Sequence, residues 1–120
     1  MENNYSALPY NLEAEQSFLG CVLVDQEIQL EMIATCSEDD FYTESHKLII
    51  RAMKNIAKDN KPIDIVTLSD EMEKTGTLAK AGGMDYITTL ATGMPSSANY
   101  KFYQAIVRRD STLRRLIRSS

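Results

Sequence analysis

The chain has 120 residues, of which 43% are hydrophobic and 25% charged, with 5 Gly and 3 Pro. These values are typical of a globular domain and exclude collagen-like and intrinsically disordered chains. A chain of this size buries about two-thirds of its unfolded surface, enough for one hydrophobic core but not for two. The longest apolar run, Phe18 to Val24, has seven residues and includes Gly20. It is far shorter than the roughly 20 residues that span a bilayer, and no signal peptide precedes it, so no membrane contact is expected.

The net charge of -4 conceals an uneven distribution along the chain. Residues 1–100 contain 7 Lys+Arg and 16 Asp+Glu, whereas residues 101–120 contain 6 and 1. An acidic body of this kind repels a phosphate backbone, so sequence-independent nucleic-acid binding is confined to the last 20 residues.

The two cysteines, Cys21 and Cys36, lie among apolar neighbours. Together with the missing signal peptide, this pattern predicts buried thiols in a reducing compartment, and the cytoplasm is the expected location.

Helix signals follow one another along the chain. Asn11 is a candidate cap, and it is followed by two acidic residues in the first turn of the next helix. Residues 44–58 place apolar side chains at the i, i+3, i+4, i+7 spacing, with basic side chains on the other face. Asp64 or Thr67 caps a further helix that ends before Gly76, and Ser97 is expected to cap the last one. We expect helices over residues 12–24, 25–36, 44–58, 64–75, 84–91 and 98–118, with a capped turn at 37–42.

No segment shows the alternation of apolar and polar residues that is typical of a strand. The sequence therefore predicts an all-α fold, a compact bundle of about six helices. The apolar stripe of the last helix still continues at Ile117, three residues from the end. Because a helix face of this kind needs a packing partner, we expect the chain to be a fragment of a longer polypeptide.

His46 is the only histidine, and it falls on the apolar face of the helix over residues 44–58. A hydrogen-bonded core histidine is the favoured interpretation. A nucleophilic pair with Cys36 is the alternative, but the sequence shows no third group to orient it.

The Gly82-Gly83 pair before a helix start predicts a turn, and a phosphate-binding backbone is the alternative. The G-x-x-x-x-G-K-[ST] loop that would support phosphate binding occurs nowhere in the chain.

Basic residues of the last helix recur every seven positions, at Lys101, Arg108 and Arg115. Contact with nucleic acid, contact with an acidic partner and simple solvation all fit this row. An autonomous nucleic-acid-binding helical module is therefore the alternative function for the chain.

Five short segments together resemble the N-terminal domain of the bacterial replicative DNA helicase, the DnaB-type family. They occur in the order and spacing of that family from Leu8 to about Ile117. The segments are Leu8-Pro9 with Glu13-Ala14-Glu15-Gln16 and Leu19-Gly20; Glu38-Asp39-Asp40-Phe41-Tyr42 with His46; Pro62-Ile63-Asp64 with Val66-Thr67-Leu68; Gly82-Gly83 with Tyr86 and Leu90; and Pro95-Ser96-Ser97-Ala98-Asn99 with Tyr103, Ile106 and Val107.

The resemblance implies a globular helical body over residues 1–97 and the truncated first arm of an antiparallel helical hairpin over residues 98–120. It implies a non-catalytic domain whose copies pair as dimers within a hexamer and form a collar. That collar receives the C-terminal helicase-binding domain of primase during DNA replication, and a helicase loader is a further candidate partner. ATP, Mg²⁺ and DNA translocation belong to the C-terminal domain of the family. No cofactor, metal site or catalytic residue is therefore expected here, and DNA is met only through the parent hexamer.

The resemblance also implies which residues act. The candidates for contacting primase, or for coupling to it, are Glu13, Tyr86, Arg114 and Ile117. The candidates for packing against the second hairpin arm or a neighbouring subunit are Phe102, Tyr103, Ile106, Val107, Leu113 and Leu116.

Overall fold

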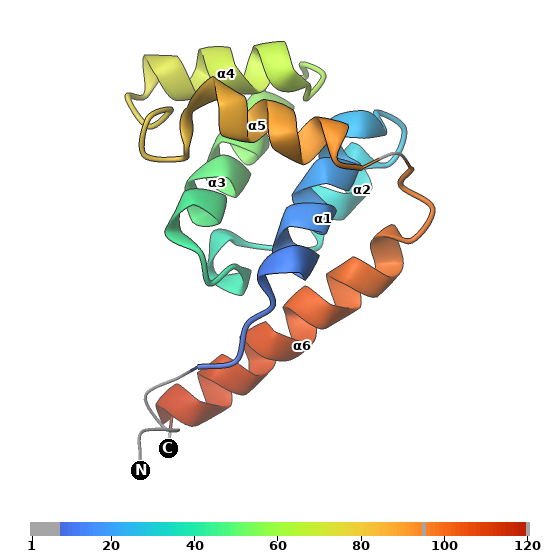
Figure 1. Ribbon diagram of the computed structural model, residues 1–120, viewed down its shortest axis with the longest axis vertical. Coiled ribbons are helices and arrows are strands. Elements are labelled where there is room, and N and C mark those ends of the chain that lie inside the picture. The colour runs from blue at the N-terminus through green and yellow to red at the C-terminus, as the bar shows by residue number, and fades with distance from the viewer. Residues whose placement is uncertain (1–7, 95, 120) are drawn as a thin grey trace.

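The computed structural model describes residues 8–94 and 96–119. Residues 1–7 of the predicted body, Pro95 of the last quoted motif, and Ser120 of the predicted arm lie outside the described residues. Within the described ranges all regular elements are helical, which confirms the predicted fold class (Figure 1). They are α1 (Leu12–Val24), α2 (Gln29–Ala34), the 3₁₀ turn η2 (Glu38–Asp40), α3 (Glu44–Lys58), α4 (Ile65–Lys74), α5 (Gly83–Thr92) and α6 (Tyr100–Ser119). None of the helices in this part of the chain is long and apolar enough to cross a membrane.

The starts of two helices are fixed by the side chains that the sequence indicated. The Oδ1 of Asn11 accepts a hydrogen bond from the Ala14 amide at 2.9 Å and caps α1. Asp64 and Thr67 form a reciprocal pair at the start of α4, each side chain accepting from the amide of the other at 2.9 Å. Such caps satisfy amides that have no partner inside the helix.

Two predicted boundaries were wrong. The helix expected over residues 25–36 is limited to α2, because Asp25 accepts from the Glu27 amide at 3.0 Å and forms a turn before it. The last helix begins at Tyr100 rather than at residue 98. Ser97 lies three residues before this start and does not cap the helix; its hydroxyl donates to the Asp25 carboxylate at 2.5 Å. In both places a side chain stabilises the connection instead of the helix.

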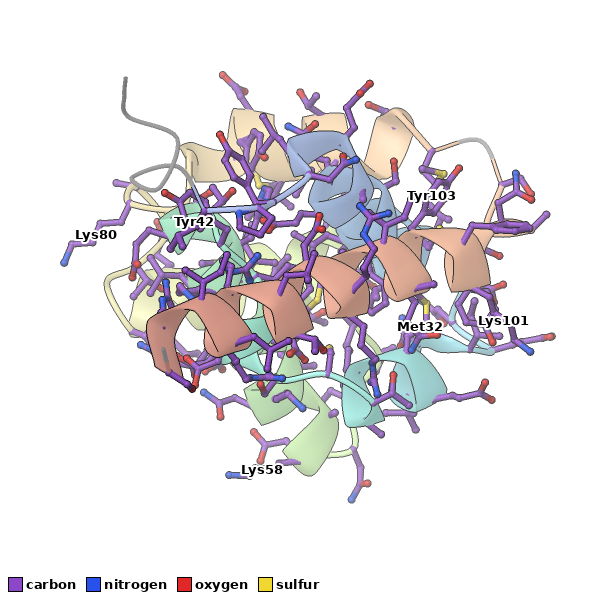
Figure 2. The ribbon with its side chains drawn as sticks, turned by 90° about the horizontal axis from the view of Figure 1, so that it is seen from below. Met32, Tyr42, Lys58, Lys80, Lys101 and Tyr103 are labelled. Carbon is purple, nitrogen blue, oxygen red and sulfur yellow. The ribbon has the colours of Figure 1, made fainter. Side chains whose placement is uncertain are left out.

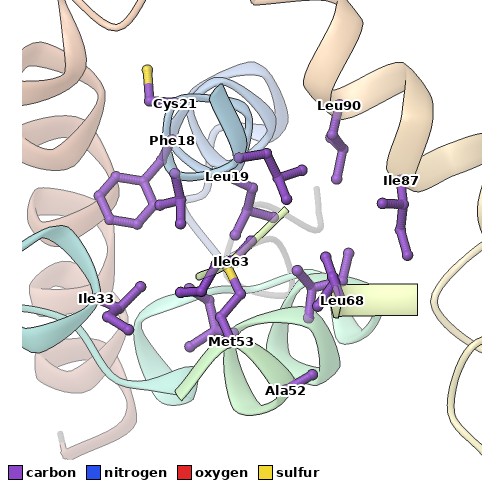
Figure 3. Close-up of a cluster of buried hydrophobic side chains, with 14 of the residues drawn as sticks. Phe18, Leu19, Cys21, Ile33, Ala52, Met53, Ile63, Leu68, Ile87 and Leu90 are labelled. Atoms are coloured by element: carbon purple, nitrogen blue, oxygen red, sulfur yellow. The ribbon is translucent and has the colours of Figure 1, made fainter. Parts of the chain in front are cut away.

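Helix α1 is the centre of the molecule and packs against α2, α3, α5 and α6 (Figure 1). Its side chains Phe18 and Leu19 point into the cluster formed with Met53, Ile63 and other residues of the surrounding helices (Figure 3). Gly20 permits the close contact of α1 with α5, because a Cβ at this position would lie 2.5 Å from the carbonyl oxygen of Leu90. The glycine is therefore needed for packing.

Helix α6 lies against α1 and η2 along one side of the body (Figures 1 and 2). Two opposite faces result, one packed on the body and one open to solvent.

Candidate partner-docking surface

The solvent face of α6 presents large apolar side chains. Phe102 is 70% exposed and Leu116 62% exposed, and Leu113 is exposed between them. At about 100° per residue these three positions share one side of the helix, with Ile117 exposed at its edge. We call Phe102, Leu113, Leu116 and Ile117 the apolar strip of α6.

The remaining packing candidates face the body. Val107 is buried in the hydrophobic core, and Tyr103 and Ile106 are partly buried against it. Their apolar surface is therefore used within the chain itself. Packing against a second arm or a neighbouring subunit stays a prediction, and it applies best to the strip.

Arg114 joins α6 to two other segments from inside the domain. It is 2% exposed, and its Nη1 and Nη2 donate to the carbonyl oxygens of Pro9 and Asp40, both at 2.9 Å. Its guanidinium lies 5.6 Å from the centre of the Tyr42 ring, which stacks on the ring of Tyr10. A group so enclosed is not accessible for direct contact with another molecule, and its bonds fix the position of α6 on the body.

The Asp40 carboxylate is the second anchor of α6. It accepts from the Ser37 amide at 2.9 Å, from the Ser111 hydroxyl at 2.7 Å and from Arg115 at 2.7 Å. Burial raises the pKa of Asp40, but these hydrogen bonds outweigh it and hold the pKa below its usual value. The carboxylate is therefore ionised at neutral pH.

Glu15 of α1 is a buried carboxylate next to the segment that follows η2. Glu15 accepts from the amides of Tyr42 at 2.8 Å and Thr43 at 3.3 Å, and its Oε1 lies 2.7 Å from Nδ1 of His46. Burial raises the pKa of Glu15, but the hydrogen bonds from His46 and the two amides lower it below its usual value. Glu15 is thus an ionised acceptor, and Nδ1 of His46 carries the proton that it accepts.

His46 connects this carboxylate to Tyr86 at the start of α5. The Nε2 of His46 lies 2.6 Å from the Tyr86 hydroxyl, which also accepts from the Gln16 side-chain amide at 3.1 Å. Both ring nitrogens are occupied, so His46 is the hydrogen-bonded core histidine that the sequence favoured, and it does not pair with Cys36. The turn also confirms the interpretation of the double glycine, since Gly82 has φ 106° and leaves room for the Tyr86 side chain.

Glu13 is exposed near the same network. It lines an open groove of about 220 Å³ between α1 and the end of α5, together with Gln16, Ser17, Thr89, Leu90, Gly93 and Met94. Gln16 lines this groove beside Glu13, and its side chain also binds the Tyr86 hydroxyl. The candidates Glu13 and Tyr86 therefore lie on the same side of the molecule. Arg114 and Ile117 lie on α6. Arg114 is connected to Tyr86 through contacts of Tyr42, Glu15 and His46.

The basic row of α6 is partly engaged by the body. Arg108 donates to the carbonyl oxygen of Thr35, and Arg115 binds Asp40. Arg109, beside the row, pairs with Asp110 at 3.1 Å. These contacts give three arginines of α6 acceptors within the chain, although Arg109 and Arg115 stay largely exposed to solvent.

No group of three or more His, Cys, Asp or Glu residues that could hold a metal ion occurs in the described ranges. Mainly because of burial, the pKa of Cys21 and that of Cys36 are both raised to about 11. Both are free thiols, protonated at neutral pH and poor nucleophiles.

Sequence reasoning missed Glu15 and Asp40, which organise these contacts. Glu15 lies three and four positions before Phe18 and Leu19, so its place on the apolar face of α1 was a usable signal. Asp40 gave no such signal, because acidic residues are common in the first turn of any helix.

Known proteins similar to this chain belong to one family. Residues 7–109 match the family described as DnaB-like helicase N terminal domain. The chain is 41% identical over 111 residues to the replicative DNA helicase DnaB of Buchnera aphidicola and 38% identical over 112 residues to the replicative DNA helicase DnaC of Bacillus subtilis. These matches cover 92% and 93% of this chain but 24% and 25% of the relatives, so the chain spans about a quarter of their length.

Two solved structures share the fold. The N-terminal domain of DnaB helicase from Mycobacterium tuberculosis has a TM-score of 0.88 at 32% identity, covering 94% of this chain and 80% of that one. A DnaB-like replicative helicase has a TM-score of 0.80 at 24% identity, covering 90% of this chain and 25% of that one, and it supports the fold alone. From its sequence and its helical body, the chain belongs to the DnaB-like helicase N-terminal domain family.

Proposed function

We propose that this domain pairs subunits of a replicative DNA helicase into a hexameric collar and provides a docking site for primase. Family membership supports the first part, because the relatives are replicative DNA helicases. The fold is also that found in the structure of a DnaB-like replicative helicase and its interactions with primase. The observation that carries the proposal is the apolar strip of α6.

The strip is suited to covering by another helix. Three large side chains, Phe102, Leu113 and Leu116, are exposed on one side of a helix whose other side is already buried. Complete burial of an exposed side chain of this size contributes about 1.5–3 kcal/mol, before the entropy of association is subtracted, and Leu113, which is only 40% exposed, contributes less. Exposed apolar surface gathered in this way is typical of protein interfaces.

Arg109 gives the strip a polar centre. It lies seven residues from both Phe102 and Leu116, which places all three on the same side of α6. Its Nε and Nη2 bind the Asp110 carboxylate at 3.1 and 3.4 Å, while its side chain is 61% exposed. A helix that covers the strip must therefore supply an acceptor for the other N–H groups of Arg109.

The strip is tested by measuring assembly. We expect Phe102→Ser and Leu116→Ser to weaken subunit association at least tenfold, both in this chain and in the parent helicase, by sedimentation velocity. Val66→Ser is the matched control, because Val66 is also 70% exposed but lies on α4. Wild-type assembly by both α6 variants would overturn the pairing proposal.

The second part of the proposal concerns the side of the molecule that bears Glu13 and Tyr86. The exposed Glu13 lines the groove between α1 and α5, and Tyr86 is held by Gln16 at the edge of that region. The acidic body, with 16 Asp+Glu and 7 Lys+Arg in residues 1–100, suits a basic partner surface.

Calorimetry with the C-terminal helicase-binding domain of the cognate primase tests docking. We expect binding that weakens as salt rises, because salt screens exposed charges. Glu13→Ala is expected to weaken it, whereas Glu73→Ala, exposed on α4, is not. No binding, either by this chain or by one extended through a second hairpin arm, would contradict the docking proposal.

Within this proposal the domain is not the catalytic part of the helicase. We assign ATP and Mg²⁺ binding, hydrolysis and DNA translocation to the rest of the parent chain, which accounts for about three-quarters of the relatives' length. A helicase loader is a further candidate partner, and the cytoplasm of a bacterium is the proposed location.

A further inference from the structure

A groove runs along α6 on the side that faces the connection between α2 and η2. It consists of two hollows of about 320 Å³ each, which meet at Thr35 and Arg108. Gln104 and Arg108 of α6 donate to the side-chain and main-chain oxygens of Thr35 at this point. The two walls of the groove are therefore joined at its middle.

The α6 wall of the groove carries three cations. Lys101, Arg108 and Arg115 recur every seven residues, and all three are exposed. From the helical rise, they extend over about 21 Å, the length of an extended peptide of about six residues. This row lies about 100° around the helix from Phe102, so it is a different face of α6 from the apolar strip.

Positive charge exceeds negative charge in this groove. Among the described residues that line it, Asp40 alone is acidic, and its carboxylate already accepts from Arg115 and from two other donors. The groove is thus an electropositive surface on an otherwise acidic domain, since residues 1–100 hold 16 Asp+Glu and 7 Lys+Arg. Complementary charge of this kind favours an acidic ligand.

The opposite wall adds an apolar contact. Leu30 is 59% exposed on α2, and it lies one turn before Ala34, which lines the groove. The Tyr100 hydroxyl donates to Glu31 at 2.9 Å, so the start of α2 lies beside the start of α6. Leu30 is therefore near the Lys101 end of the groove. An apolar side chain contributes nothing to the binding of a phosphate backbone, whereas a peptide can place a large side chain on it.

We propose that this groove binds an extended acidic peptide of another protein, whose carboxylates pair with Lys101, Arg108 and Arg115 and whose one large apolar side chain packs on Leu30. Exposed ion pairs are individually weak, so the affinity depends on several of them acting together with the apolar contact. The groove is separate from the apolar strip and from the side that bears Glu13. The inference therefore does not depend on the function proposed above.

Fluorescence anisotropy with a defined peptide tests the proposal. The probe is a fluorescein-labelled peptide of six aspartates and one terminal phenylalanine, made in both sequence directions and titrated with this chain. We expect micromolar binding at about 50 mM salt and a loss of about tenfold or more at about 300 mM, because salt screens exposed charges. A peptide in which serine replaces every aspartate should not bind.

Charge reversal identifies the surface. We expect Lys101→Glu combined with Arg108→Glu to weaken binding by about tenfold or more, and Lys101→Glu alone, which breaks no bond seen among the described residues, by roughly threefold. Lys58→Glu combined with Lys80→Glu is the matched control, because it changes the net charge equally at exposed positions away from Lys101 (Figure 2). Leu30→Ser should remove the preference for the peptide with phenylalanine over aspartates alone.

Each outcome bears on the groove alone. Salt-sensitive binding that the groove variants weaken and the control variant keeps supports the proposal. It is overturned by an absence of binding at low salt, by equal loss in the groove and control variants, or by binding that neither phenylalanine nor Leu30→Ser affects. Tighter binding of a labelled oligothymidylate of the same length would assign the groove to nucleic acid, and also overturns it. Subunit assembly and primase docking are measured on other surfaces, so their outcomes are independent of this one.

Discussion

The guanidinium of Arg114 donates to the main-chain oxygen of Asp40 at 2.9 Å, so that α6 is fastened to the backbone of η2 and not to a mobile side chain. A second bond reaches Pro9, and the group is 2% exposed. We expect Arg114→Ala to lower the free energy of unfolding by about 2–4 kcal/mol, because the buried carbonyl group of Asp40 and the partly buried one of Pro9 lose their donor. Urea denaturation measures this change.

Two substitutions make the test specific. Arg118→Ala, which removes an exposed arginine from the last turn of the same helix, should change stability by no more than about 0.5 kcal/mol. Arg114→Lys keeps the charge but cannot reach both carbonyl groups at once, and an intermediate loss is expected. Equal stability of Arg114→Ala and Arg118→Ala would contradict the role given to Arg114.

Acid should weaken the attachment of α6 to η2, because Asp40 takes part in it as a carboxylate. The folded-state pKa of Asp40 lies below its usual value, so the carboxylate stabilises the fold above about pH 4. This contribution is lost as pH falls through the folded pKa. Asp40→Asn is expected to cost about 1–2 kcal/mol at pH 7, mainly through the bonds from Ser37 and Ser111, because Arg115 is largely solvent-exposed.

The comparison of unfolding at pH 7 and pH 3 provides the measurement. The difference in unfolding free energy between wild type and Asp40→Asn should narrow at the lower pH, because the contribution of the Asp40 carboxylate decreases as it takes up a proton. A difference in unfolding free energy that does not change with pH would show that Asp40 stabilises the fold through its packing and not through its charge.

Much of the fold was predictable because its signals are local. Asn11 and Asp64 lie within four residues of the amides that they cap, and the apolar spacing of residues 44–58 defines α3 without reference to the rest of the chain. Such interactions are formed by any chain with these residues in this order.

The site was less predictable because its contacts join distant segments. Arg114 belongs to a basic helix and has the pattern of a solvated residue, but it donates a hydrogen bond to a carbonyl group 105 positions earlier. Val107 and Phe102 have the same apolar character, and only the packing of α6 on α1 places one inside and the other outside. The periodicity of α6 separates these two faces, but it does not say which of them packs on the body.

The alternative function, autonomous binding of nucleic acid, gives a further prediction. Four arginines of α6 donate to acceptors within the chain: Arg108, Arg109, Arg114 and Arg115. For the other two cations of the helix, Lys101 and Arg118, no acceptor is seen among the described residues. We expect no retention of single- or double-stranded DNA at about 50 mM salt. Retention with a log-log salt slope of about -4 to -5 on duplex DNA would instead establish that module.

The adjacent glycines before α5 provide a matched pair of substitutions. Gly82 and Gly83 have φ values of 106° and 77°, so alanine is strained at either position, by about 1–3 kcal/mol. They differ in their surroundings: a Cβ at Gly82 would lie 2.7 Å from the Tyr86 Cβ, whereas one at Gly83 meets no atom within 4 Å. Gly82→Ala must therefore displace Tyr86 as well, and with it the hydroxyl from His46. We expect Gly82→Ala to be the less stable variant in urea and to shift the NMR signals of the His46 ring, which Gly83→Ala should leave in place. If both variants lose the same stability and leave the His46 signals unchanged, the packing of Tyr86 on Gly82 does not hold the Tyr86 hydroxyl against His46.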